Sequence, residues 1–178
     1  MKKYAAILLI FICIIIVFHL FQFAGAEPVL NVMICSESEA GSDECYTVYS
    51  NGKTKEIHAF DKDQNASFTR VASGGFESTI IDNQVVNTLQ DTMLRDETGK
   101  TFPPDKEENA LMQEMADTIP HDIWDFTIIR VENKLFAFAK LNVNWTSPCE
   151  LYYFDPETKE LILLHQWDAV DLIAVSEP

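Results

Sequence analysis

The chain has 178 residues, and its 13 basic and 28 acidic side chains give it a net charge of −15 at pH 7. A field of that sign repels nucleic acid and anionic lipid surfaces, so neither class of partner is expected. Hydrophobic residues make up 47% of the chain, which is enough for a packed core.

The first 26 residues are typical of an export signal. Met1-Lys2-Lys3 is cationic, residues 4–23 are almost continuously apolar, and Ala24-Gly25-Ala26 supplies the small residues that a signal peptidase requires. The apolar run is also long enough to span a bilayer, so this segment is either cleaved before Glu27 or kept as an anchor. Both alternatives leave the lysines inside and residues 27–178 outside the cytoplasmic membrane, which only residues 4–23 would contact.

Residues 27–178 are predicted to form a single exported domain, because their number is typical of one domain. Loss of the leader removes Lys2 and Lys3 but no acid, which leaves 11 basic and 28 acidic residues and a net charge of −17. This charge suits cationic partners or loosely held divalent cations, and it also keeps an exported protein soluble.

The segment from Asp122 to Val175 is predicted to be the centre of the fold. Its apolar runs are of strand length and are separated by turn residues at 132–134, 144–148 and 155–158, which is typical of an antiparallel meander. The run Leu135-Phe136-Ala137-Phe138-Ala139 is apolar at consecutive positions. Both faces of that strand should therefore be covered, in the middle of a sheet.

The amino-terminal half predicts further strands, which lie at 28–35, 45–49, 55–60 and 67–72. Asn51-Gly52 is a turn that tolerates positive φ and joins two of them as a hairpin. Together with the carboxy-terminal runs, these strands predict an antiparallel sheet of about seven or eight strands, built from hairpins and meanders.

One or two helices are predicted to cover one face of this sheet. Between Glu77 and Leu94, apolar residues recur at every fourth position, which favours a helix. A second helix, from Asp105 to Thr118, has acids in its first turn, prolines before it and a Met and Leu stripe at helical spacing. The predicted fold class is therefore α+β.

Three cysteines follow the leader. Cys35 ends one predicted strand and Cys45 begins the next, so a disulfide between them is a candidate in an oxidising compartment. Cys149 would then be free, packed in the core or linked to another chain. A nucleophilic Cys149 would make the protein a small exported hydrolase, although no orienting motif accompanies it.

Metal and cofactor motifs are weak or missing. Residues 61–65 place oxygens at alternate positions, as calcium loops do, which makes a calcium-responsive domain another alternative. Ala66 and Ala72 stand where an EF-hand loop needs Gly and Glu. The histidines lack zinc-ligand spacing and the glycines form no phosphate loop, so no cofactor or metal site is predicted.

The favoured hypothesis is a non-enzymatic extracytoplasmic binding module for a protein or envelope component. Aromatic side chains with an apolar body and a polar tip suit interfaces, and Trp145 lies in a turn-like segment where burial is difficult. The acidic loop at 36–44 would add negative charge to the surface that binds the partner. The residues predicted to bind the partner are Trp145, Tyr152, Trp167, Glu37, Glu39 and Asp43.

Overall fold

A computed structural model describes residues 24–36, 43–58, 67–71, 76–81, 84–89, 93–95, 100–131, 134–142 and 148–178. One α-helix, α2 (Lys106–Thr118), lies in this part of the chain. The strands are β1 (Pro28–Ser36), β2 (Asp43–Tyr49), β3 (Thr54–Ile57), β4 (Ser67–Val71), β5 (Phe76–Ile81), β6 (Gln84–Leu89), β7 (Leu94–Arg95), β8 (Thr101–Phe102), β9 (Ile123–Val131), β10 (Lys134–Leu141), β11 (Cys149–Asp155), β12 (Glu160–Trp167) and β13 (Val170–Ser176).

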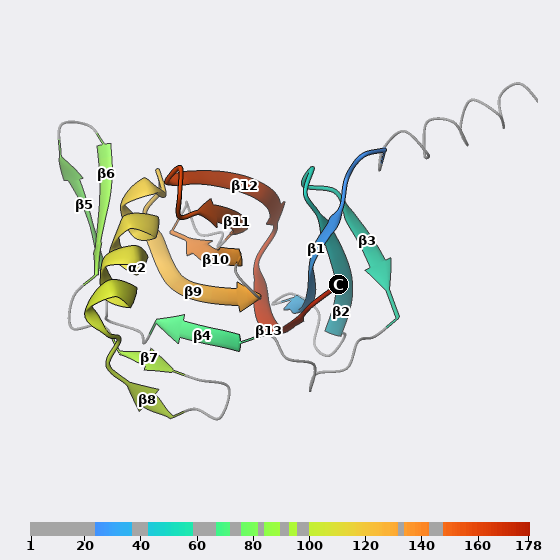
Figure 1. The fold of residues 1–178 in the computed structure, drawn as a ribbon, viewed down its shortest axis with the longest axis horizontal. Coiled ribbons are helices and arrows are strands. Elements are labelled where there is room, and N and C mark those ends of the chain that lie inside the picture. The colour runs from blue at the N-terminus through green and yellow to red at the C-terminus, as the bar shows by residue number, and fades with distance from the viewer. Residues whose placement is uncertain are drawn as a thin grey trace, which may run out of the picture.

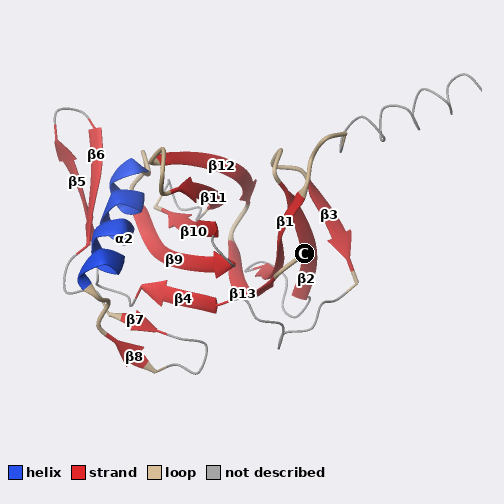
Figure 2. Ribbon diagram, viewed as in Figure 1, coloured by secondary structure: helices blue, strands red, loops and turns tan. Residues whose placement is uncertain are grey.

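The elements form three layers (Figures 1 and 2). A seven-stranded central sheet has the order β12-β11-β10-β9-β4-β7-β8, and a four-stranded small sheet has the order β13-β1-β2-β3. Helix α2 and the two-stranded ribbon β5-β6 lie on the other side of the central sheet. The sequence predicted one sheet of seven or eight strands; the antiparallel α+β class is confirmed, and the strands divide among three sheets.

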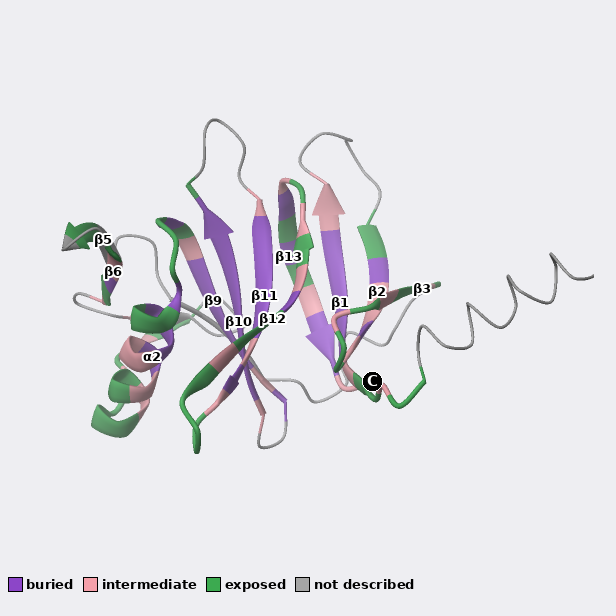
Figure 3. Cartoon of the chain, turned by 90° about the horizontal axis from the view of Figure 1, so that it is seen from above, coloured by how far each residue is buried: buried purple, intermediate pink, exposed green. Residues whose placement is uncertain are grey.

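The middle of the central sheet is buried on both faces. Leu135, Ala137 and Ala139 of β10 belong to the core beneath helix α2, whereas Phe136 and Phe138 belong to the core against the small sheet. Figure 3 shows buried residues along most of β9, β10 and β11. The prediction that this run is the middle of a covered sheet is therefore confirmed, because consecutive apolar residues alternate between two cores.

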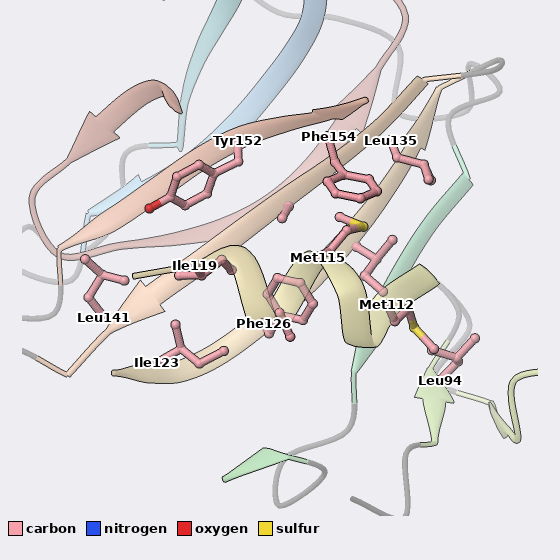
Figure 4. Close-up of a cluster of buried hydrophobic side chains, with 14 residues drawn as sticks. Leu94, Met112, Met115, Ile119, Ile123, Phe126, Leu135, Leu141, Tyr152 and Phe154 are labelled. Carbon is pink, nitrogen blue, oxygen red and sulfur yellow. The ribbon is translucent and has the colours of Figure 1, made fainter. Parts of the chain in front are cut away.

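Helix α2 covers the first of these cores. Its amino terminus is capped by Asp105, whose side chain accepts a hydrogen bond from the Glu108 amide at 2.7 Å. Met112 and Met115 point from the helix into the cluster that contains Phe126 (Figure 4). The predicted Met and Leu stripe thus faces the sheet, and the helix predicted at 105–118 is confirmed.

The helix predicted from Glu77 to Leu94 is wrong, because this segment holds the β5-β6 hairpin and reaches β7. A spacing of four is also a multiple of the strand period of two, so Val85 and Leu89 share one face of β6. The segment is rich in β-branched residues, which favour strands, and Asp82-Asn83 has the length of a two-residue hairpin loop.

Amide side chains hold this ribbon on the helix. Gln113 of α2 accepts from the Leu89 amide at 2.8 Å and donates to the Asn87 carbonyl at 2.9 Å, as a neighbouring strand would. The fully buried Asn87 side chain donates in turn to the carbonyls of Ala116, Ile119 and His121, at 3.3, 2.9 and 3.0 Å. The last carbonyls of a helix lack internal donors, so Asn87 caps α2 from another element.

Residues 1–23 lie outside the described residues, so the predicted signal peptide or anchor stays a prediction. Among the residues that the structure describes, α2 is too short and too polar to cross a bilayer, and no other helix could do so.

Candidate functional site

A groove of about 230 Å³ opens between the central sheet and the small sheet, near the start of β1. Its lining comes from both sheets and from the turn after β2: Glu27, Val29, Ser50, Lys134, Phe136, Tyr153, Ile162 and Leu164. The site therefore combines the start of β1 and the turn after β2 with strands β10, β11 and β12 of the central sheet.

The floor of the groove is a row of cross-strand neighbours. Phe136 of β10 is directly opposite Tyr153 of β11, and Tyr153 is opposite Ile162 of β12. Directly opposed residues project from the same face of a sheet, which brings these three side chains together. The Phe136 and Tyr153 rings lie 5.6 Å apart, tilted by 55°, and Ile162 remains 45% exposed at the outer end of the row.

The turn after β2 forms the rim on the side of the small sheet. Ser50 is bonded to Glu27, the residue before β1. The Ser50 hydroxyl accepts a hydrogen bond from the Glu27 amide at 3.1 Å, and the Ser50 amide donates to the Glu27 carbonyl at 2.8 Å. In the same turn, the Gly52 carbonyl lies 3.0 Å from His165 Nδ1 of β12. A carbonyl only accepts, so this contact requires a proton on Nδ1. The rim is therefore tied to the edge of the central sheet.

Two opposite charges stand over this apolar floor. Lys134 is half-buried and Glu27 is exposed, and both line the groove. Within the described part of the chain, neither side chain makes an ion pair or a hydrogen bond of its own. The groove thus offers one cation and one anion to a ligand without first breaking a contact among described residues.

A second polar cluster lies on the helix side of the central sheet. The Tyr152 hydroxyl donates to the buried Glu150 carboxylate, and His121 Nε2 lies 3.9 Å from the same carboxylate. Burial, and next the hydrogen bond to Glu150, raise the pKa of Tyr152 above its ordinary value. Figure 4 shows Tyr152 among the apolar side chains of the helix core. Tyr152 therefore stays protonated, and its hydroxyl gives the buried Glu150 carboxylate a hydrogen-bond donor.

The structure does not bring the predicted partner-binding residues together. Trp145, Glu37 and Glu39 lie outside the described residues, and Asp43 is exposed at the start of β2. Tyr152 is only 4% exposed. Trp167 is half-buried, with its ring centroid 6.1 Å from that of Phe138 and 4.5 Å from that of His165. None of the described members lines the groove.

The three cysteines that the structure describes, Cys35, Cys45 and Cys149, are thiols. Cys35 is paired with Asp43 and Cys45 with Met33, so the two cysteines are offset by two residues along the ladder. A Cys35–Cys45 bridge would need this ladder to shift, and it stays a prediction. Cys149 is fully buried between the two sheets, where its thiol donates to the Val170 carbonyl at 3.0 Å.

Sequence reasoning missed Lys134 and the groove residues of β12. Lys134 reads as a turn residue between two strands, and Ile162 reads as one apolar position in a run. Neither pattern indicates a cavity, because the groove exists only where the amino-terminal strands form a second sheet over the first. The available signal was the alternation in β12, which places Ile162 and Leu164 on one face.

Together, these features define an α+β protein with two stacked antiparallel sheets, a helix on the far face and a small apolar groove between the sheets. No protein-family model matches the chain, and no characterised protein or solved structure shows significant similarity to it. Among the described residues, no group of three His, Cys, Asp or Glu side chains could hold a metal ion. The calcium-like segment at 61–65 lies outside the described residues.

Proposed function

We propose that this chain is an extracytoplasmic, non-enzymatic binding module for a protein or envelope component, and that the inter-sheet groove is its binding surface. The observation that carries the proposal is the exposed Ile162, 45% accessible at the end of an apolar row that leads from the surface to the buried Phe136. Large apolar groups beside a concave, apolar surface are typical of binding sites.

The size of the groove favours an anchoring group over a whole small-molecule ligand. Sites for drug-sized ligands usually enclose about 300 Å³ or more, whereas an apolar cavity of about 150 Å³ can hold benzene. A groove of about 230 Å³ therefore fits one large apolar side chain. Interfaces between proteins commonly depend on one or a few such anchors placed in a pocket.

The charge of the module favours a cationic partner. Residues 27–178 carry a net charge of −17, which attracts basic surfaces and raises their rate of encounter. The partner expected from charge and groove together is a polypeptide with basic residues around an apolar anchor.

The test is capture of envelope proteins on immobilised residues 27–178, compared between two neighbouring variants. Ile162→Asp places a charge in the groove, whereas Leu163→Asp places the same charge on the other face of β12, at a residue that is 50% exposed. We expect Ile162→Asp to abolish capture of a specific partner and Leu163→Asp to retain it. Equal capture by both variants, or capture no greater than on an unrelated protein of the same charge, would contradict the proposal.

A further inference from the structure

We infer that the groove takes the carboxyl-terminal residue of a basic polypeptide, with the terminal carboxylate on Lys134 and the terminal apolar side chain against Phe136 and Ile162. This inference rests on the proposed function, because it names the part of the partner that occupies the same groove.

Lys134 supplies the first argument. Lys134 is half-buried in a groove whose other lining residues are mostly apolar, and it has no anionic partner among the described residues. A partly desolvated cation gains most from an anion that enters with the ligand, since charge-assisted hydrogen bonds are the stronger ones. A main-chain carboxylate next to a side chain is found in proteins at the carboxyl terminus.

The cavity supplies the second argument. A free main-chain carboxylate belongs to the last residue of the partner polypeptide. When that carboxylate contacts Lys134, the side chain of the same residue must fit into the space next to Lys134. The space of about 230 Å³ next to the Phe136 and Tyr153 rings suits one branched or aromatic side chain. A second large side chain would not fit, which favours a chain end over the middle of an extended segment.

The remaining charges supply the third argument, and they decide what precedes the terminal residue. Glu27 lines the same groove and has no side-chain partner among the described residues. With a net charge of −17 behind it, this carboxylate favours a lysine or arginine upstream of the terminus. An acidic peptide with the same terminal residue would be repelled by this net negative charge.

The experiment measures binding of short labelled peptides to residues 27–178 by fluorescence anisotropy at low salt. This part of the chain contains every core residue of both clusters, from Leu30 to Val175, and its folding is checked by a thermal melt. The probes are a lysine-containing peptide that ends in leucine, its carboxyl-terminal amide, and the same peptide ending in glycine. The variants are Lys134→Gln, Lys134→Arg and Lys55→Gln, of which the last removes an exposed lysine and matches the charge change.

We expect amidation to weaken binding about tenfold, which corresponds to about 1.4 kcal/mol, and the change to glycine to weaken it as well. In Lys134→Gln the free and amidated peptides should bind equally, whereas Lys134→Arg and Lys55→Gln should keep the preference for the free carboxylate. Equal binding of the free and amidated peptides to the unmodified chain would overturn the inference, and so would a preference that survives in Lys134→Gln.

The two proposals fail in different ways. If capture of a partner depends on Ile162 but no peptide prefers a free carboxylate, the groove is a binding surface for another part of the partner and this inference is overturned. If no peptide prefers a free carboxylate and capture does not depend on Ile162 either, both the inference and the proposed function are overturned.

Discussion

Replacement of Gly52 by alanine tests the contact that holds the two sheets together beside the groove. Gly52 has φ +78°, and a Cβ added there would lie 2.2 Å from the carbonyl oxygen of Leu164 and 3.2 Å from its carbonyl carbon. Both are backbone atoms of β12, so no side-chain rotation relieves the overlap. The turn must move away from the edge of the central sheet.

The expected cost has two contributions. A residue with a Cβ in the left-handed region costs about 1–2 kcal/mol. Separation of the turn from β12 breaks the hydrogen bond between His165 Nδ1 and the Gly52 carbonyl, for which about 0.5–1.5 kcal/mol is typical. We therefore expect Gly52→Ala to lower the free energy of unfolding by about 1.5–3.5 kcal/mol, a large part of the roughly 5–15 kcal/mol that most proteins have.

Urea unfolding followed by far-UV circular dichroism measures this change, and His165→Ala completes a double-mutant cycle. Because Gly52→Ala already separates the two groups, we expect His165→Ala to cost less in the Gly52→Ala chain than in the unmodified chain. A loss below about 1 kcal/mol in Gly52→Ala, or strictly additive losses, would refute the reasoning, because the turn would then not be fixed by β12.

Three further predictions concern single residues. Asn87→Asp removes the donors that cap α2 and places a negative charge at the helix carboxyl terminus, so urea unfolding should show a loss of about 2–4 kcal/mol in the free energy of unfolding. The control is Gln84→Glu, a change of equal charge at an exposed residue of the same strand, which should cost little. Equal losses in the two variants would contradict the capping role. The hydrogen bond to Glu44, together with burial, raises the pKa of Tyr46 to about 12, so ultraviolet titration should lose a step near that pH in Tyr46→Phe. The stability linked to this bond is present below pH 10 and is lost as the pH rises through about 12, because the folded pKa lies above the unfolded one; no difference between the two proteins would contradict it. Reaction with a thiol reagent should be far slower at Cys149 in the folded chain than in urea, because the thiol is fully buried. Fast labelling of Cys149 in the folded chain would favour the hydrolase alternative. A single reactive thiol among residues 27–178 in urea would favour the Cys35–Cys45 disulfide.

The sequence predicted best where local pattern and burial agree. The run 135–139 has apolar side chains at each position, and a strand with two covered faces is the arrangement that buries them all. Asp105 and the acids after it specify where α2 begins, whatever the helix packs against. These features depend on neighbouring residues alone.

The β5-β6 ribbon shows where local pattern becomes ambiguous. Apolar residues at every fourth position are compatible with both a helix and a strand, and the β-branched residues were the better guide. The ribbon is placed by Asn87 and Gln113, whose partners lie 24 to 34 residues away along the chain. No neighbouring residue indicates that an isolated asparagine will cap a distant helix.

The groove could not be predicted from the sequence because it depends on a bend in strand β12. The pairing of β11 with β12 shifts between Leu151 and Tyr152, so Tyr152 is opposite Leu163 whereas Leu151 is opposite His165. Leu164 is the extra residue of this bulge, and bulges bend a strand and change the direction of its side chains. The strand bends there toward the small sheet, and its Leu164 carbonyl reaches Gly52.

The same bulge therefore connects stability with binding. Leu164 lines the groove through its side chain and contacts the Gly52 turn through its backbone, and Ser50 of that turn lines the opposite rim. A change that moves the turn must widen the groove, since both of its walls are defined by this contact. Ligand binding should accordingly weaken in Gly52→Ala even under conditions where the chain remains folded, whereas Asn87→Asp acts on the far face of the central sheet and should leave binding by the folded chain unchanged. If Asn87→Asp weakened binding as much as Gly52→Ala, the loss would reflect general destabilisation, and the groove would lose its connection to the β12 bulge.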